Sequence, residues 1–193
     1  MNKGWLKVPG IRPDGDRTLE EQMLGLAPAV AEVQNARAAG TPLTVLDLGC
    51  AEGLIGREFA RAGAADVLGI EVLATHLAVA RKACKAEKQM RFICAHLRDW
   101  IKAHPEPEQF DIVLALGIIH KLEDPAVPLR FAARSARSLL IFRAPAKATD
   151  GVVRAKHGDG ACNVPQIMQE EGFVEERLIP GARGEAAQYW RRK

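Results

Sequence analysis

Residues 45 to 53 read Val45-Leu46-Asp47-Leu48-Gly49-Cys50-Ala51-Glu52-Gly53. A run of apolar residues ends in an acid and a loop of small residues, and a helical pattern begins near Leu54. This order predicts a buried strand, a turn whose glycines let a ligand approach the backbone, and a helix that points its first N–H groups at the same spot. Ligands of open parallel sheets bind at this end of the strands, so the stretch predicts a nucleotide-type site.

The glycine spacing of this loop differs from that of a dinucleotide site. The glycines stand at 49, 53 and 56, whereas a pyrophosphate loop uses G-x-G-x-x-G, and Ala51 takes the place of the middle glycine. Asp47, just before the turn, would repel a pyrophosphate and suits a ligand with a positive charge, such as an amine or a sulfonium. Both features oppose a nicotinamide-dependent oxidoreductase. The structural alternative is a tight turn with no ligand.

A second apolar stretch, Val67-Leu68-Gly69-Ile70-Glu71, also ends in a carboxylate. Glu71 lies 24 residues after Asp47, close to the spacing at which an acid reaches ribose hydroxyls in Rossmann-type sites. One carboxylate can accept hydrogen bonds from both vicinal hydroxyls. Alone, Glu71 would more often be a solvated strand end; beside the first loop, it predicts a ribose site.

The rest of the chain alternates short apolar stretches with helical patterns, which predicts parallel strands with helices on both faces. Strands are expected at 43–48, 66–71, 90–94, 110–116 and 138–143, and helices at 54–63, 74–86, 97–103 and 124–137. Asn163 is expected to cap a last helix that ends at Gly172. The strands at 173–179 and 186–191 should pair antiparallel, because their connection is too short for a crossover helix. The predicted fold is an α/β three-layer sandwich with a mostly parallel seven-stranded sheet, its last strand antiparallel.

The N-terminal part of the chain has a different pattern. Residues 1–17 read as an irregular arm, and Thr18 to Glu21 fit a capping box for a helix at 19–38 that is broken near Pro28. We expect residues 1–40 to form an arm and helix that can serve as a lid, with Trp5 or Leu6 over the site. Surface packing is the alternative for Trp5. Residues 41–193 are expected to be the functional domain of a single-domain chain.

Composition excludes several classes of protein. The chain has 193 residues, 48% of them apolar, and a formal net charge of +3, which by itself does not predict nucleic-acid binding. The four cysteines, at 50, 84, 94 and 162, form no C-x-x-C pair, so no metal site is predicted. No apolar run is long enough for a signal peptide or a membrane span. We therefore expect a cytoplasmic protein with no membrane partner.

These motifs resemble those of class I S-adenosylmethionine-dependent methyltransferases. VLDLGCAEGLIG at 45–56 and VLGIEV at 67–72 are similar to the family's first two cofactor motifs. FDIVLALG at 110–117, with His120 and the dipeptide Asp124-Pro125 after it, is similar to the fourth-strand motif. The resemblance covers about residues 41 to 193. It implies a methyltransferase domain with S-adenosylmethionine as cofactor.

The resemblance also implies which residues hold the cofactor. Asp47, Gly49 and Gly53 would surround its methionine part, Glu71 would hold the ribose, and the end of the third strand would flank the adenine. His96 stands at about the place of an acid that the family often has near the adenine. The residues expected to bind the cofactor are Asp47, Gly49, Cys50, Ala51, Gly53, Glu71, Val72, His96, Leu97 and Leu116.

His120 is the candidate general base. It follows the fourth strand at the ligand end of the sheet, and an imidazole titrates near neutrality. The alternative is a structural histidine packed in the turn. His157 is a weaker candidate, at the rim of the site.

The acceptor of the methyl group is expected to be a small molecule or an RNA. The chain shows no dedicated nucleic-acid-binding module, and its sequence does not predict an oligomeric state. Arg130, Arg134 and Arg137 fall at helical spacing, a pattern more typical of a solvated helix face than of an RNA contact. The alternative functions are a non-catalytic relative that binds the cofactor and, less favoured, a nicotinamide-dependent oxidoreductase.

Overall fold

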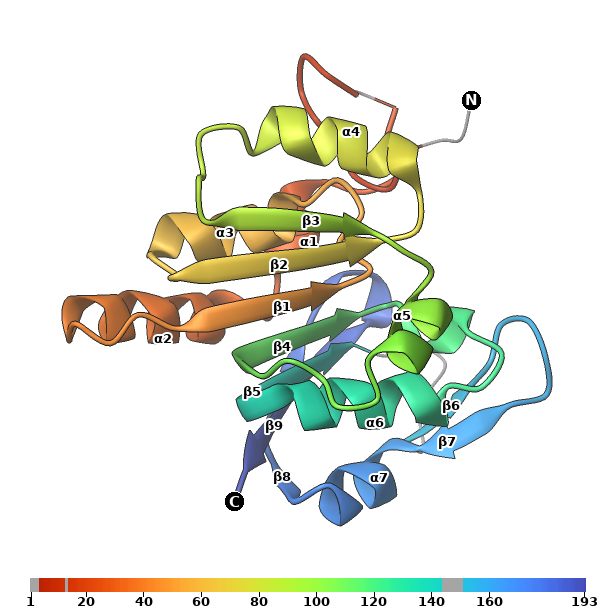
Figure 1. The fold of residues 1–193 in the computed structure, drawn as a ribbon. Helices are drawn as coiled ribbons and strands as arrows, with labels where there is room; N and C mark the ends of the chain where they lie inside the picture. Colours follow the sequence, from red (N-terminus) through yellow and green to blue (C-terminus); the bar gives the residue numbers. More distant parts are fainter. Residues whose placement is uncertain (1–3, 13, 144–150) are drawn as a thin grey trace. The chain divides into compact units, whose positions relative to one another are not determined.

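The computed structural model describes residues 4–12, 14–143 and 151–193 (Figure 1). The chain divides into two compact units, Met1–His96 and Leu97–Lys193, which are described one at a time. The boundary between the two units does not test the predicted division at residue 40, which stays a prediction.

Parallel strands form the centre of the first unit, in the order β3-β2-β1. They are β1 (Thr44–Leu48), β2 (Asp66–Glu71) and β3 (Met90–Cys94). Helices α3 (Leu54–Ala62) and α4 (Ala74–Ala83) connect them, as parallel neighbours require (Figure 1). Leu48 pairs with Ile70 and Glu71 with Cys94, so the carboxyl ends of all three strands meet at one edge.

Two short helices precede β1, as α1 (Leu19–Met23) and α2 (Ala27–Ala38). The capping box is confirmed, since Thr18 Oγ1 accepts from the Glu21 N–H and the Glu21 carboxylate accepts from the Thr18 N–H. The predicted break is also confirmed, but it lies before the proline rather than at it. Leu24 leaves the helical conformation, and Pro28 sits in the first turn of α2, where no N–H is needed.

The second unit holds the remaining main strands, in the order β4-β5-β9-β8. They are β4 (Phe110–Leu116), β5 (Ala136–Arg143), β8 (Phe173–Pro180) and β9 (Ala186–Arg192). Strand β9 runs antiparallel to β5 and β8, as predicted for the last pair. The helical segments are α5 (Leu97–Ala103), η1 (Ile119–Lys121), α6 (Ala126–Ser135), α7 (Val164–Glu170) and η2 (Ala182–Gly184). Asn163 caps α7 as expected, by accepting the Gln166 N–H.

The structure differs from the prediction in two places of the second unit. A hairpin of β6 (Val152–Arg154) and β7 (Ala161–Asn163) was not predicted, because strands of three residues are too short to show an alternating pattern. The helix expected at 124–137 ends at Ser135, so Arg137 lies on β5 and not on the helix.

The predicted fold class is confirmed: an α/β protein with a mostly parallel seven-stranded sheet that has an antiparallel last strand and helices around it. Within the described residues, every helix is too short or too polar to cross a membrane. The same residues contain no group of three or more His, Cys, Asp or Glu side chains arranged to hold a metal ion.

Candidate functional site

The loop after β1 takes the conformation that its glycines allow. Gly49 and Gly53 have φ angles of 73° and 71°, in the left-handed region that glycine enters without a steric cost. The N–H groups of Gly49 and Cys50 both donate to the Ile70 carbonyl, and the Gly53 N–H donates to the Cys50 carbonyl. The loop is therefore fastened to β2 before it enters α3.

Ala51 lies in the same loop and also has a positive φ, of 47°. A residue with a Cβ atom adopts this region at a cost of roughly 1–2 kcal/mol. The Ala51 N–H donates to Glu71 Oε2 at 3.1 Å, a bond to a charged acceptor that offsets part of the cost. The chain thus forms the loop with Ala51 where a dinucleotide loop has its middle glycine.

Gly53 is the N-cap residue of α3, and a side chain there would be strained. A Cβ atom there would lie 2.9 Å from the Phe92 ring, and φ is positive. We expect Gly53→Ala to lower the unfolding free energy by about 2 kcal/mol or more, from backbone strain plus the overlap. Gly40→Ala is the matched control, because Gly40 has a φ of 80° and nothing within 4 Å of the added atom. Urea unfolding measures both variants, and equal losses would mean that the Phe92 overlap costs nothing.

Glu71 ends β2 with its carboxylate among backbone donors. Oε2 accepts from Ala51, and Oε1 accepts from the Leu73 N–H at 2.9 Å. The residue is 9% exposed. A carboxylate offers about four acceptor directions, so Glu71 has capacity for two more hydrogen bonds. Val72, next to it, is an apolar residue left 50% exposed at this edge, which suits contact with an apolar ring.

Asp47 is a buried carboxyl group with an unmet hydrogen-bonding capacity. It is 3% exposed, and Oδ2 has no hydrogen-bond partner. Burial, and after it the nearby Glu71 charge, raises the pKa of Asp47 to about 7, although a backbone hydrogen bond at Gly56 opposes the shift. A positively charged ligand group near Asp47 would favour its ionised form.

The other predicted residues of the first unit have different surroundings. Cys50 is buried, and its Sγ packs so closely on Gly69 that a Cβ there would lie 2.7 Å from the sulfur. Burial, followed by Asp47 and Glu71, raises the pKa of the Cys50 thiol, so it packs as an inert apolar group. His96, at the end of the unit, is exposed.

Leu97, Leu116 and His120 belong to the second unit. Leu97 is the buried first residue of α5, and Leu116 is the half-buried last residue of β4. His120 lies on η1, where its carbonyl accepts from the Lys156 N–H at 2.6 Å. Burial of the ring lowers the pKa of His120, and the positive charges of Lys121 and Lys156 lower it further. The ring is therefore neutral at pH 7 and able to take a proton. His157 lies at the exposed tip of the β6–β7 hairpin.

Two residues near the loop were not predicted from the sequence. Glu52 is fully buried and accepts the backbone N–H groups of Trp5 and Leu6 from the arm. His76, on α4, is 7% exposed and lies beside Glu52 and Glu71. The position of Glu52 within the small-residue loop is the one sequence feature that could have indicated its role. The sequence carries no signal for the role of His76.

The arm itself packs on the start of α3 and on α4. Leu6, at 1% exposure, forms a buried cluster with Val8 and Leu54, and Trp5 is half-buried beneath the Arg17 guanidinium. Trp5 and Leu6, the two residues expected to cover the site, therefore pack within the first unit.

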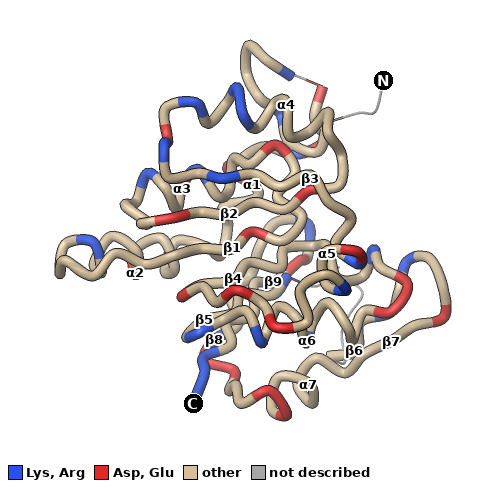
Figure 2. Tube along the Cα trace, in the orientation of Figure 1, with Lys and Arg blue, Asp and Glu red and all other residues tan. Residues whose placement is uncertain are grey.

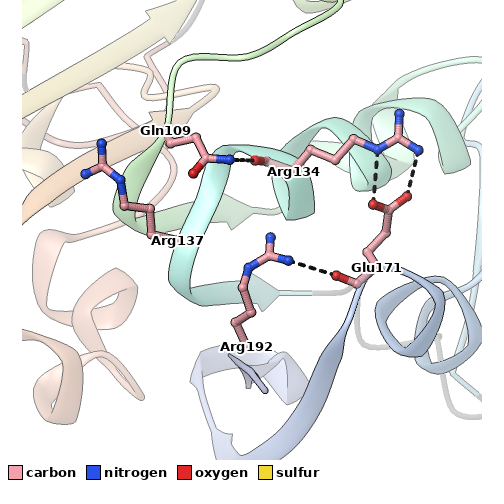
Figure 3. A pocket seen from close by; sticks show the side chains of 5 residues that line it. All are labelled: Gln109, Arg134, Arg137, Glu171 and Arg192. Carbon is pink, nitrogen blue, oxygen red and sulfur yellow. Dashed lines mark hydrogen bonds and ion pairs between the residues drawn. The ribbon is translucent and has the colours of Figure 1, made fainter.

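The arginines of α6, and Arg137 of β5, are paired with acids. Arg134 donates two hydrogen bonds to Glu171 and Arg130 pairs with Glu170 and Glu171, and Arg137 lies 3.5 Å from Asp111. Figure 3 shows Arg134 and Glu171 in a polar pocket of about 370 Å³ in this unit. In both units Lys and Arg are interspersed with Asp and Glu (Figure 2). This pairing favours the solvated-face interpretation over an RNA contact.

The sequence has recognisable relatives. Residues 45–139 match the family described as methyltransferase domain. The predicted resemblance to class I S-adenosylmethionine-dependent methyltransferases is thereby confirmed. A ubiquinone biosynthesis O-methyltransferase of Neisseria meningitidis (serogroup A) is 34% identical over 92 residues, which cover 47% of this chain and 38% of that protein. One of Rhodopseudomonas palustris (strain BisA53) is 38% identical over 82 residues, 42% and 31% of the two chains. The chain thus spans less than two fifths of the curated relatives it matches.

Solved structures extend the likeness beyond the methyltransferase domain. Magnesium protoporphyrin IX methyltransferase from Synechocystis PCC 6803, with bound SAH, aligns over 93% of this chain and 90% of its own, with a TM-score of 0.64 and 19% identity. The N-methyltransferase NodS from Bradyrhizobium japonicum WM9, in complex with S-adenosyl-L-homocysteine, aligns over 86% of both chains, with a TM-score of 0.63 and 16% identity. At these identities the likeness concerns the fold alone.

Proposed function

We propose that the chain is an S-adenosylmethionine-dependent methyltransferase that acts on a small molecule. The observation that supports this most is the pair of carboxylates at the ends of β1 and β2. Asp47 has a buried oxygen without a partner, and Glu71 has spare acceptor capacity. The cofactor would bring a cationic sulfonium and ammonium and a ribose diol, which fit these two groups. Gly49, Ala51 and Gly53 would lie against its methionine part, and Val72 against its adenine.

The residues of this chain would bind and orient, and the bound cofactor supplies an activated methyl group. Glu71 accepts the ribose hydroxyls, and the loop backbone fixes the reacting end. Where the acceptor carries a hydroxyl proton, a neutral His120 would take it while the acceptor oxygen gains the methyl group and the carbon–sulfur bond breaks. Relatives named ubiquinone biosynthesis O-methyltransferases support an oxygen acceptor on a small molecule. The cytoplasmic location expected from the sequence stays a prediction.

RNA is the less favoured acceptor, because the arginines that would contact it are paired with Glu170, Glu171 and Asp111. A nicotinamide-dependent oxidoreductase is opposed by Asp47, whose charge would face a pyrophosphate. A non-catalytic relative would bind the cofactor in the same way and would differ only in turnover.

Isothermal titration calorimetry with S-adenosylmethionine, S-adenosylhomocysteine and NADH tests the proposal. We expect binding of the first two and none of NADH. Absence of binding by both sulfur compounds would refute the proposed function, and binding of NADH alone would support the oxidoreductase instead.

His120→Gln tests the base. Loss of a positioned proton acceptor is expected to lower kcat about 100-fold, with an unchanged Kd for S-adenosylhomocysteine. The pKa of His120 lies below its usual value, so the wild-type rate should be flat above about pH 6.5 and fall as the ring gains its proton at lower pH. The assay uses hydroxylated aromatic acceptors, and His157→Gln, at the hairpin tip, is the matched control. Equal rates for the two variants and wild type would assign His120 a structural role.

A further inference from the structure

A buried carboxylate ties the N-terminal arm to the loop after β1. Glu52 accepts the N–H groups of Trp5 and Leu6, each at 2.9 Å, and Arg12 Nη1 lies 3.9 Å from its Oε1. The side chain is 0% exposed. A buried carboxylate is costly when it lacks hydrogen-bond donors. Glu52 would lose two of its donors if the arm moved away, so it stabilises the arm in its present position.

His76 lies between this carboxylate and Glu71. Its Nε2 is 3.7 Å from Glu52 Oε1, and its Nδ1 is 3.9 Å from Glu71 Oε1. The ring is buried, and neither nitrogen has a hydrogen-bond partner. Each distance exceeds hydrogen-bond length by less than about 1 Å, so a small shift of the ring or of a carboxylate completes a bond. A singly protonated imidazole donates from one nitrogen only, so the ring can complete a bond to one of the two carboxylates at a time.

We propose that His76 is a positioning residue that couples closure of the arm to occupation of the cofactor site. The inference rests on the proposed function, in which Glu71 accepts the ribose hydroxyls. When those hydroxyls occupy the remaining acceptor directions of Glu71, His76 is left to donate to Glu52 and holds it in the orientation that the arm requires. Such coupling is reciprocal, so a closed arm raises cofactor affinity by the same factor as the cofactor favours the closed arm.

Leu6 allows the arm to be loosened without changing either carboxylate. Its side chain is 1% exposed in a cluster with Val8 and Leu54, against which Val79 and Ala83 of α4 also pack. Leu6→Ala removes this packing and leaves the backbone N–H that Glu52 accepts. His76→Phe keeps the ring shape and removes both nitrogens.

A double-mutant cycle on the affinity for S-adenosylhomocysteine tests the coupling. We expect Leu6→Ala and His76→Phe each to weaken binding about 5-fold, the lower end of ordinary coupling factors, and the double variant to weaken it no further. Single effects that multiply in the double variant would overturn the inference. His104→Phe, a histidine stacked on Trp100 in the second unit, is the control and should bind as wild type.

Trypsin cleavage after the exposed Lys7 provides the reciprocal measurement. S-adenosylhomocysteine should slow this cleavage about 5-fold in the wild type and leave its rate unchanged in His76→Phe. A merely structural His76 would lower the melting temperature but leave that protection intact, which would overturn the inference. His76→Gln replaces the phenylalanine variant if the latter does not fold. A wild type that binds no S-adenosylhomocysteine contradicts the proposed function, whereas binding without coupling contradicts this inference alone.

Discussion

Glu71→Gln is expected to weaken the binding of S-adenosylhomocysteine about 100-fold. A glutamine has one acceptor oxygen, whereas the carboxylate has two. In the wild type each of the two carboxylate oxygens already accepts one backbone N–H, from Ala51 and from Leu73. The variant therefore keeps at most one hydrogen bond to the ribose, and its NH₂ group leaves one backbone N–H without an acceptor. Each of the two lost bonds is worth about 1.5 kcal/mol when the acceptor is charged. Together these amount to about 3 kcal/mol, which corresponds to the stated loss. Calorimetric titration of the purified variant gives the Kd directly.

Asp66→Asn is the matched control for this experiment. Asp66 begins the same strand, at its opposite end, and pairs with Arg91 at the surface. We expect its affinity for S-adenosylhomocysteine to equal that of the wild type. If Glu71→Gln also binds normally, Glu71 serves the loop alone and the ribose lies elsewhere.

Asp47→Asn is expected to raise stability at high pH and to weaken cofactor binding at the same time. The folded pKa of Asp47 is about 7, above its ordinary value of 3.8. Between these values the folded state holds a proton that the unfolded state has released, so the stability of the wild type falls as pH rises through this window. The difference between these two pKa values corresponds to roughly 4 kcal/mol. An asparagine does not titrate, so the variant escapes this loss.

Urea unfolding of both proteins at pH 5 and pH 8 measures the effect. The difference in unfolding free energy, variant minus wild type, should grow by about 2 kcal/mol or more between these pH values. Placing an amide NH₂ where Oδ2 has no partner lowers the stability of the variant by the same amount at both pH values. Comparing the difference at pH 5 with the difference at pH 8 cancels this constant cost. A difference that is the same at both pH values would show that Asp47 is ionised throughout.

Most of the parallel framework could be predicted because its signals are local. The strand of residues 45–48 and the capping box at Thr18 follow from patterns a few residues long, and the structure has both. The β6–β7 hairpin was missed because its strands are too short to show a period. Arg137 was misplaced because the helical spacing continues past Ser135, where the chain enters β5 and the sheet decides its conformation.

The predicted site was less complete than the predicted fold. The loop and Glu71 stand out because glycine and acid positions are visible in the sequence. The relation of Glu52 to His76 depends on contacts between residues 24 positions apart on different elements, and neither residue type marks such a contact in advance. Apolar periodicity places helices and strands, but it carries no information about which buried polar groups will meet.

The two backbone N–H groups that donate hydrogen bonds to Glu71 affect the selectivity of this site for its ligand. Because Ala51 and Leu73 hold the carboxylate, it cannot rotate toward a ligand without releasing the loop. Its remaining acceptor directions are fixed before any ligand arrives, so little conformational entropy is lost on binding. A rigid acceptor of this kind binds a diol of matching geometry tightly, and it binds a diol of different geometry weakly because the carboxylate cannot reorient. Selectivity at this edge of the sheet thus arises from preorganisation rather than from the number of contacts.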